Sequence, residues 1–174
     1  MSASNSVLTF FAHNGAMRLL SGKEHDGALA FMQKAADVAK GSCCLRSKCG
    51  SIIVNDSGII GAGFNSPPGN KCLKACIKDS LPKDFRSDRT CCLHAEQRAM
   101  MDALKRNPKK VHGSRIYFIR LDDKGNMMPS GKPYCTICSK MALDIGIAEF
   151  ALMRKEGICV YGTKEYNDVS FGNE

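Results

Sequence analysis

Two short motifs place metal-binding side chains at regular spacing along the chain. His94 and Glu96 lie two residues apart, and Cys135 and Cys138 lie three residues apart. Residues three apart lie on one face of a helix, so one ion can contact both sulfurs. Three protein ligands and an open position are typical of a catalytic zinc site. We therefore predict that His94, Cys135 and Cys138 bind zinc.

Glu96 is the candidate for proton transfer beside this metal. Zinc lowers the pKa of a bound water to about 7, which supplies hydroxide at neutral pH. Glu96 has no need to bind zinc, so it can carry the proton of that water to the substrate ring and the leaving group. Two other interpretations stay open at this point. Glu96 could only complement a helix dipole, and Cys135 with Cys138 could form a redox pair.

Hydrophobic periodicity places both motifs at the starts of predicted helices. Apolar residues recur at helical spacing over 26–40, 93–106 and 136–145, so His94 opens the second helix and Cys135 the third. Apolar and β-branched runs predict strands over 51–54, 59–64, 115–121, 147–153 and 158–161. This order predicts an α/β fold in which helices pack on a mixed sheet of about five strands.

Composition favours one folded domain with anionic partners. Among 174 residues, 25 Lys plus Arg against 17 Asp plus Glu give a formal net charge of +8, which suits nucleotides or nucleic acid. Apolar residues make up 44%, which excludes disorder as the dominant state. No apolar run approaches the roughly 18 residues that cross a bilayer, so no membrane association is expected. We expect an N-terminal arm over residues 1–25 and a folded domain over 26–174. The first twenty residues lack the pattern of a secretory signal, so a reducing, cytoplasmic location is expected.

Together the motifs resemble the zinc-dependent cytidine and deoxycytidylate deaminase superfamily, whose signature is H-x-E followed by P-C-x-x-C. Residues 49–54 and 61–69 are similar to the first two strands and the following loop of deoxycytidylate deaminases. The resemblance implies a three-layer α/β/α fold. It also implies that Asn65 hydrogen-bonds the sugar or the leaving-group side of the substrate, and that the backbone N–H of Ala95 contacts the pyrimidine carbonyl.

One residue departs from the pattern of that superfamily. Proline usually stands directly before the first cysteine ligand, whereas Tyr134 separates Pro133 from Cys135 here. The backbone at that position normally helps to hold the amino group of the base, so the change concerns substrate geometry more than zinc binding. Tyr134 is expected either to stack on a base or to fill the loop.

The eight remaining cysteines fall into two groups. Four of them lie within or directly after the long polar segment 65–90: Cys72, Cys76, Cys91 and Cys92. Deoxycytidylate deaminases of some lineages carry a second, structural zinc in this region, and four thiolates could clamp a loop that lacks its own core. The alternative is reduced thiols. For the other four we expect buried thiols: Cys43, Cys44, Cys49 and Cys159.

The resulting prediction is a zinc-dependent hydrolytic deaminase of a cytosine nucleotide resembling dCMP. The motif and the positive charge also suit a tRNA adenosine deaminase or another polynucleotide deaminase. A zinc-bound module without turnover is the third hypothesis. Aromatic residues interleaved with basic ones are sparse, which favours a small nucleotide over a single strand. The resemblance also predicts a homo-oligomer, whereas residues 162–174 carry no pattern from which we predict a role.

Overall fold

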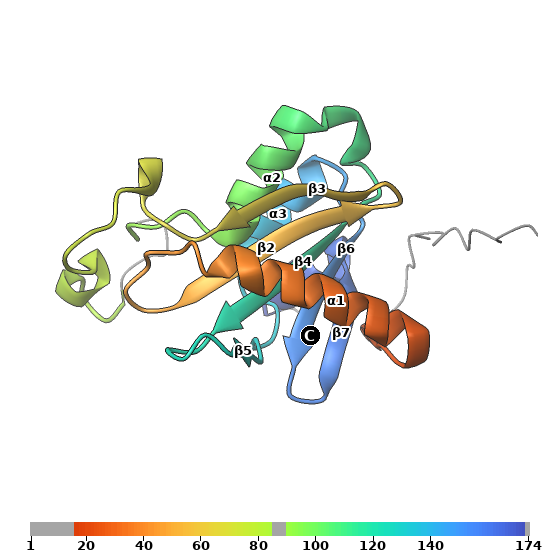
Figure 1. Cartoon of the computed structure of the whole chain (residues 1–174), viewed down its shortest axis with the longest axis horizontal. Helices are drawn as coiled ribbons and strands as arrows, with labels where there is room; N and C mark the ends of the chain where they lie inside the picture. Colours follow the sequence, from red (N-terminus) through yellow and green to blue (C-terminus); the bar gives the residue numbers. More distant parts are fainter. Residues whose placement is uncertain (1–15, 85–89, 173–174) are drawn as a thin grey trace, which may run out of the picture.

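A mixed sheet with the strand order β1-β7-β6-β4-β2-β3 forms the centre of the fold (Figure 1). The structure is a computed structural model that describes residues 16–84 and 90–172. The strands are β1 (Arg18–Leu19), β2 (Lys48–Asn55), β3 (Gly58–Phe64), β4 (Arg115–Leu121), β5 (Met127–Met128), β6 (Glu149–Arg154) and β7 (Gly157–Gly162). Strand β5 pairs with β4 outside this order. Strands β4 and β6 run parallel, and the other pairs that the structure describes are antiparallel.

The helices are α1 (Gly22–Ala39), α2 (Ala95–Arg106), α3 (Thr136–Asp144) and α4 (Thr163–Ser170) in the described part of the chain. Short 3₁₀ turns cover Pro68–Asn70, Ile77–Ser80 and Pro108–Lys110. The five predicted strands correspond to β2, β3, β4, β6 and β7, and the three predicted helices to α1, α2 and α3. The two-residue strands and α4 were not expected. No described helix is both long and apolar enough to span a membrane.

Helices cover both faces of the sheet, which confirms the predicted α/β/α layers. Helix α1 lies over one face, and α2 and α3 lie over the other (Figure 1). On its inner side, α1 buries Ala28, Met32, Ala35 and Ala39 at helical spacing, and these pack with Ile52 and other sheet residues. A second core on the opposite face contains residues of α2, α3 and α4.

The predicted N-terminal arm is partly built into the sheet. Arg18 and Leu19 pair with Val160 and Cys159 of β7, and α1 already begins at Gly22. Residues 1–15 of the arm lie outside the described residues.

Two glycines let α2 rest directly on β3. A Cβ atom on Gly63 would lie 2.5 Å from the backbone nitrogen of Ala99, and one on Gly61 would lie 2.5 Å from the Ala99 carbonyl oxygen. Real side chains do not tolerate such distances, so glycine sets how closely the helix approaches. The backbone N–H of Leu93 also donates to the carbonyl of Ser66, 3.0 Å away. Together these contacts fix where α2 begins.

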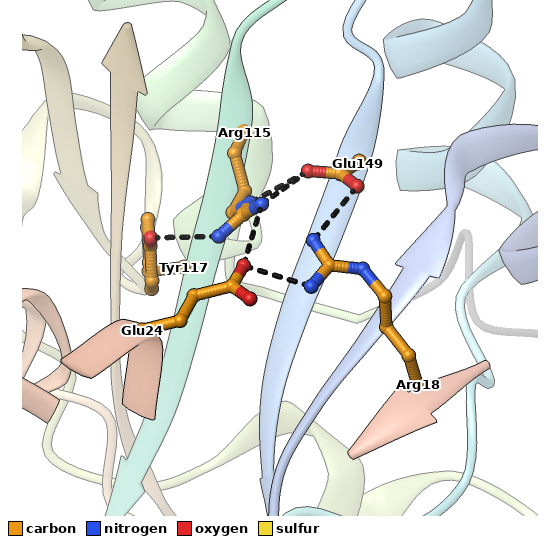
Figure 2. A network of polar contacts seen from close by, with 5 residues as sticks. All are labelled: Arg18, Glu24, Arg115, Tyr117 and Glu149. Atoms are coloured by element: carbon orange, nitrogen blue, oxygen red, sulfur yellow. Dashed lines mark hydrogen bonds and ion pairs between the residues drawn. The ribbon is translucent and has the colours of Figure 1, made fainter. Parts of the chain in front are cut away.

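A buried charge network fastens the N-terminal segment to the sheet (Figure 2). Arg115 at the start of β4 donates from Nε to Glu149 at the start of β6, 2.7 Å away, and the two residues are register partners. Arg18 of β1 reaches Glu149 at 3.3 Å and Glu24 of α1 at 2.7 Å. Arg115 also donates to the Tyr117 hydroxyl at 3.3 Å. Since Arg115 is 5% and Glu149 4% exposed, each charge depends on its partners.

Candidate metal centre and its cavity

The structure brings the three predicted metal ligands into mutual contact. His94 Nδ1 lies 3.1 Å from Cys135 Sγ and 3.4 Å from Cys138 Sγ, and the two sulfurs are 3.2 Å apart. Among the described residues, these three form a group whose ligand atoms all lie within 4.8 Å of one another. Cys138 is buried, whereas His94 and Cys135 are partly accessible from the cavity. One imidazole and two thiols around one point are a donor set that zinc prefers.

Two helix starts position these ligands. His94 directly precedes α2, where its backbone N–H donates to Gln97 Oε1 at 2.9 Å. Cys135 directly precedes α3, and its sulfur accepts the backbone N–H of Cys138 at 3.4 Å. Unpaired N–H groups at helix starts favour negative charge on a nearby thiolate.

Local hydrogen bonds prepare one thiol for metal binding. The bond with Cys138 and then the one with His94 lower the pKa of Cys135 to about 4. The contact with Cys135 raises the pKa of His94, and the same pairing together with burial raises that of Cys138. At neutral pH Cys135 is therefore a thiolate, which is the form that coordinates a metal.

Glu96 sits in the first turn of α2 and faces the same cavity. It is only 5% exposed, and burial raises its pKa to about 7. A carboxyl group with this pKa exchanges protons readily at neutral pH, so the site contains a suitable general acid and base.

A cavity of about 550 Å³ opens in front of these residues. This volume is within the range of small-molecule sites, about 300–1,000 Å³. Glu96 is the one acid among its described lining residues. Four cationic side chains also line the cavity: Arg46, Lys78, Arg120 and Lys132. The charge of the wall suits an anionic ligand. The predicted substrate contacts Asn65 and Ala95 line the same cavity.

Asn65 has a structural task in addition to its place in the cavity wall. Its Oδ1 accepts from Ser42 Oγ at 2.7 Å and from the backbone N–H of Cys49 at 2.8 Å. Its amide nitrogen donates to the Ser47 carbonyl at 2.8 Å. An amide nitrogen carries two hydrogens, so one donor remains for a ligand.

Comparison with known proteins identifies the family. Residues 26–154 match the model described as "Cytidine and deoxycytidylate deaminase zinc-binding region". The chain belongs to this family. It is 35% identical over 78 residues to a deoxycytidylate deaminase of Saccharomyces cerevisiae (strain ATCC 204508 / S288c), and 30% identical over 80 residues to one of Schizosaccharomyces pombe (strain 972 / ATCC 24843). Each match covers 42% of this chain but only 24% of the relative.

Solved structures show the same deaminase fold. A dCMP deaminase from the cyanophage S-TIM5, in complex with dCMP and dUMP, has a TM-score of 0.52 at 24% identity, over 75% of this chain and 82% of the other. A cytidine deaminase from Burkholderia pseudomallei has a TM-score of 0.53 at 16% identity, over 79% of this chain and 94% of the other. The predicted family and fold class are thus confirmed.

Tyr134, which departs from the family's motif, stands at the cavity with its side chain in solvent. It is 83% exposed and lines the opening together with Pro133. The side chain therefore does not fill the loop that precedes Cys135. Its ring is accessible to a ligand.

The second group of cysteines is arranged differently from the prediction. Cys72 forms a disulfide with Cys43, so it offers no thiolate to a structural zinc and Cys43 is not a free thiol. The prediction that Cys72 joins Cys76, Cys91 and Cys92 in binding a second zinc is therefore wrong for Cys72. The thiols of Cys91 and Cys92 lie 3.8 Å apart. Both line the cavity, as do Cys44, Cys49 and Cys76. Sequence spacing could not reveal the pairing, because Cys43 and Cys72 meet only when the long loop folds back.

Several residues of the cavity were missed in the sequence. Phe118 and Arg120 project from β4 and Leu152 from β6, and Phe118 and Leu152 are register partners. Alternation along a strand that ends near the motifs could have indicated Phe118 and Arg120. Tyr166 reaches the cavity from α4, for which the sequence had no signal.

Proposed function

We propose that this member of the deaminase family hydrolyses the exocyclic amine of a cytosine nucleotide resembling dCMP. One observation carries the proposal: the His94, Cys135 and Cys138 group and the buried Glu96 share one cavity with cationic walls. The matched relatives are named as deoxycytidylate deaminases, which supports the choice of a deoxynucleotide. The shared segment is about a quarter of those relatives, so the substrate rests on the cavity itself.

The residues present fit one catalytic zinc ion. His94 Nδ1 and the sulfurs of Cys135 and Cys138 converge, and Cys135 is already a thiolate at neutral pH. When bound, the ion supplies a water of lowered pKa as the nucleophile. Cys72 is held in a disulfide with Cys43, and His94, Cys135 and Cys138 form the one group of converging donor atoms among the described residues, so we propose one zinc per chain.

Glu96 moves the protons of the reaction. Hydrolysis adds one water to C4 of cytosine and releases one ammonia, leaving a carbonyl group. Glu96 accepts a proton from the water, delivers a proton to the ring nitrogen, and transfers the remaining proton to the leaving amine. Its pKa of about 7 lets it perform both transfers without a large cost in either direction.

Backbone and cationic groups hold the nucleotide. Ala95 is the first residue of α2, where the backbone N–H has no acceptor within the helix and is available to the pyrimidine carbonyl. The remaining amide hydrogen of Asn65 is available to the sugar. Arg120, which donates to Ser47 Oγ at 3.3 Å, and Lys132 line the wall and suit a phosphate group.

The test is the release of ammonia by purified protein from four substrates: dCMP, deoxycytidine, guanine and tRNA. We expect dCMP to react fastest and metal analysis to give one zinc per chain. Removal of the metal by a chelator should abolish the reaction, and added zinc should restore it. Preferred reaction of tRNA would favour the polynucleotide deaminase, which the net charge of +8 also suits. Zinc binding without any turnover would favour a non-catalytic module. The cytoplasmic location and the homo-oligomer stay predictions.

A further inference from the structure

Ser42 is a buried serine that bonds two residues of the cavity wall. It follows the last turn of α1, where its backbone N–H donates to the Ala39 carbonyl at 3.0 Å, and it is 4% exposed. Its Oγ accepts the backbone N–H of Cys44 at 3.1 Å. The same Oγ lies 2.6 Å from the backbone carbonyl oxygen of Asn65 and 2.7 Å from Asn65 Oδ1. Cys44 and Asn65 line the cavity, whereas Ser42 is not among its described lining residues.

The hydroxyl of Ser42 holds the side chain of Asn65 to its own backbone. A serine hydroxyl carries one hydrogen, and because its oxygen accepts from Cys44, this hydrogen is available to the two oxygens of Asn65. In the described part of the chain, the other hydrogen-bond partners of Asn65 are backbone groups of Ser47 and Cys49. Ser42 is therefore the partner that a change of side chain can remove without altering the backbone contacts.

These contacts decide which end of the Asn65 amide is available to a ligand. Oδ1 accepts the Cys49 N–H at 2.8 Å, and Nδ2 donates to the Ser47 carbonyl at 2.8 Å. Exchanging the oxygen and the nitrogen would place two donors opposite each other at Cys49 and two acceptors at Ser47, so the network allows one orientation. Nδ2 keeps one hydrogen beyond its bond to Ser47, whereas Oδ1 already faces two donors. Asn65 therefore offers a ligand a donor and not an acceptor.

The chemistry of a deoxycytidine nucleotide limits which sugar group can meet this donor. Its 5′ position carries the phosphate and its 2′ position carries no hydroxyl, so the 3′-hydroxyl is the one free hydroxyl of the sugar. The oxygen of that hydroxyl can accept the remaining N–H of Asn65.

We propose that Ser42 is a positioning residue that makes the site selective for a nucleotide with a free 3′-hydroxyl. Its own hydroxyl holds the Asn65 amide in the orientation that donates to the sugar. The inference deepens the proposed function and rests on it. Without Ser42, the Asn65 side chain loses the contact that joins it to its own backbone, so the amide is held less firmly. A neutral hydrogen bond contributes a factor of roughly two to ten, which sets the size of the effect.

The first test compares dCMP with 2′,3′-dideoxycytidine 5′-monophosphate, which lacks the 3′-hydroxyl. In kcat/KM, we expect the wild type to prefer dCMP by roughly five- to tenfold, and Ser42→Ala and Asn65→Ala by less than about twofold. The matched control is Ser51→Ala. That serine is also buried, but its hydroxyl donates to the Tyr117 carbonyl at 3.0 Å and it is not among the described lining residues of the cavity. An undiminished preference in Ser42→Ala, or an equal loss in Ser51→Ala, would overturn the proposal.

A second pair of variants separates the hydroxyl of Ser42 from the shape of its side chain. Ser42→Thr keeps the hydroxyl, whereas Ser42→Val puts a methyl group in its place, and both add the same branch at Cβ. We expect Ser42→Thr to retain the preference for dCMP and Ser42→Val to lose it. Equal preferences in the two variants would contradict the proposal. Because each preference compares two substrates in one preparation, it is independent of the fraction of the variant that is folded.

Binding of the product nucleotide gives a readout that needs no turnover. Isothermal titration calorimetry measures the Kd of dUMP and of 2′,3′-dideoxyuridine 5′-monophosphate. We expect the wild type to bind dUMP roughly five- to tenfold more tightly and Ser42→Ala less than about twofold more tightly. If this difference appears but dCMP releases no ammonia, the proposed function fails and the role of Ser42 stands. If ammonia is released but the wild type shows no preference for the 3′-hydroxyl in either assay, the role of Ser42 fails and the proposed function stands.

Discussion

The buried charged residues at the two ends of the parallel strands β4 and β6 differ in whether they have a partner of opposite charge. At their beginnings, Arg115 and Glu149 face each other and are joined by Arg18 and Glu24 (Figure 2). Towards their other ends, Phe118, Arg120 and Leu152 form the wall of a cavity that also holds Glu96. Glu96 is equally buried, but burial raises its pKa to about 7.

The difference teaches what each end is built for. Opposite charges at bonding distance satisfy each other, so the Arg115 end is ordered and chemically inert. At the Glu96 end, the carboxyl group of Glu96 has a pKa at which it exchanges protons near neutral pH. The thiolate of Cys135 beside it can bind a cation. Such a perturbed group in a cleft is typical of a functional site.

Breaking the reactive end should give the largest effect. Glu96→Gln retains the size of the side chain but cannot transfer protons, so kcat for dCMP should fall by about a thousandfold. Zinc content, measured by metal analysis, should be unchanged. Glu156→Gln is the control, because Glu156 is an exposed partner of Arg154. Full turnover by Glu96→Gln would refute the assigned role.

Breaking the inert end should affect stability and not chemistry. Glu149→Ala leaves Arg115 buried without its main partner, and we expect the free energy of unfolding to fall by about 3–5 kcal/mol. Denaturant titration measures this loss. The exposed pair of Lys164 and Asp168 serves as the control, where Asp168→Ala should cost less than about 1 kcal/mol. A loss of kcat per folded molecule in Glu149→Ala would show that the two ends are coupled.

The pH dependence of stability sharpens the comparison in the metal-free protein. The pKa of Glu96 is about 7 in the folded chain and 4.5 ordinarily, so folding favours its protonated form. The folded state is therefore most stable, as far as Glu96 is concerned, below pH 4.5, and it loses this stability as the pH rises towards 7. Relative to Glu96→Gln, the wild type should lose about 3 kcal/mol over this window. Thermal or denaturant unfolding at pH 4.5 and 7.5 measures it; parallel curves for the two proteins would contradict the assignment.

The smallest expected effect concerns the cationic wall. Arg120→Ala should raise KM for dCMP roughly tenfold and leave KM for deoxycytidine unchanged, because a charge-assisted bond to the phosphate is lost. Steady-state kinetics with both substrates measures the difference. Lys48→Ala, on the exposed start of β2, is the control. Equal effects of Arg120→Ala on both substrates would exclude a phosphate contact.

Much of the fold could be predicted from local pattern. Apolar runs such as 115–121 and periodic segments such as 26–40 correspond closely to β4 and α1. The candidate ligands His94, Cys135 and Cys138 could be recognised because their spacing and their position at helix starts are local properties. By contrast, α4 has only Thr163 and Tyr166 buried, which is too weak a pattern to detect. Strand β1 pairs with the edge of β7, and β5 pairs with the end of β4 that extends beyond its pairing with β6, so both strands depend on partners distant in the sequence.

The amino-acid sequence by itself determined the order of the main helices and strands and the candidates for the metal ligands and the proton carrier, because these depend on residue type and short spacing. Only the tertiary structure decided which distant groups surround them. The Cys43–Cys72 disulfide, the Arg115–Glu149 pair and the place of Tyr166 in the wall of the cavity join segments far apart in the chain. Such contacts follow from how the sheet and helices pack, and no local pattern encodes them.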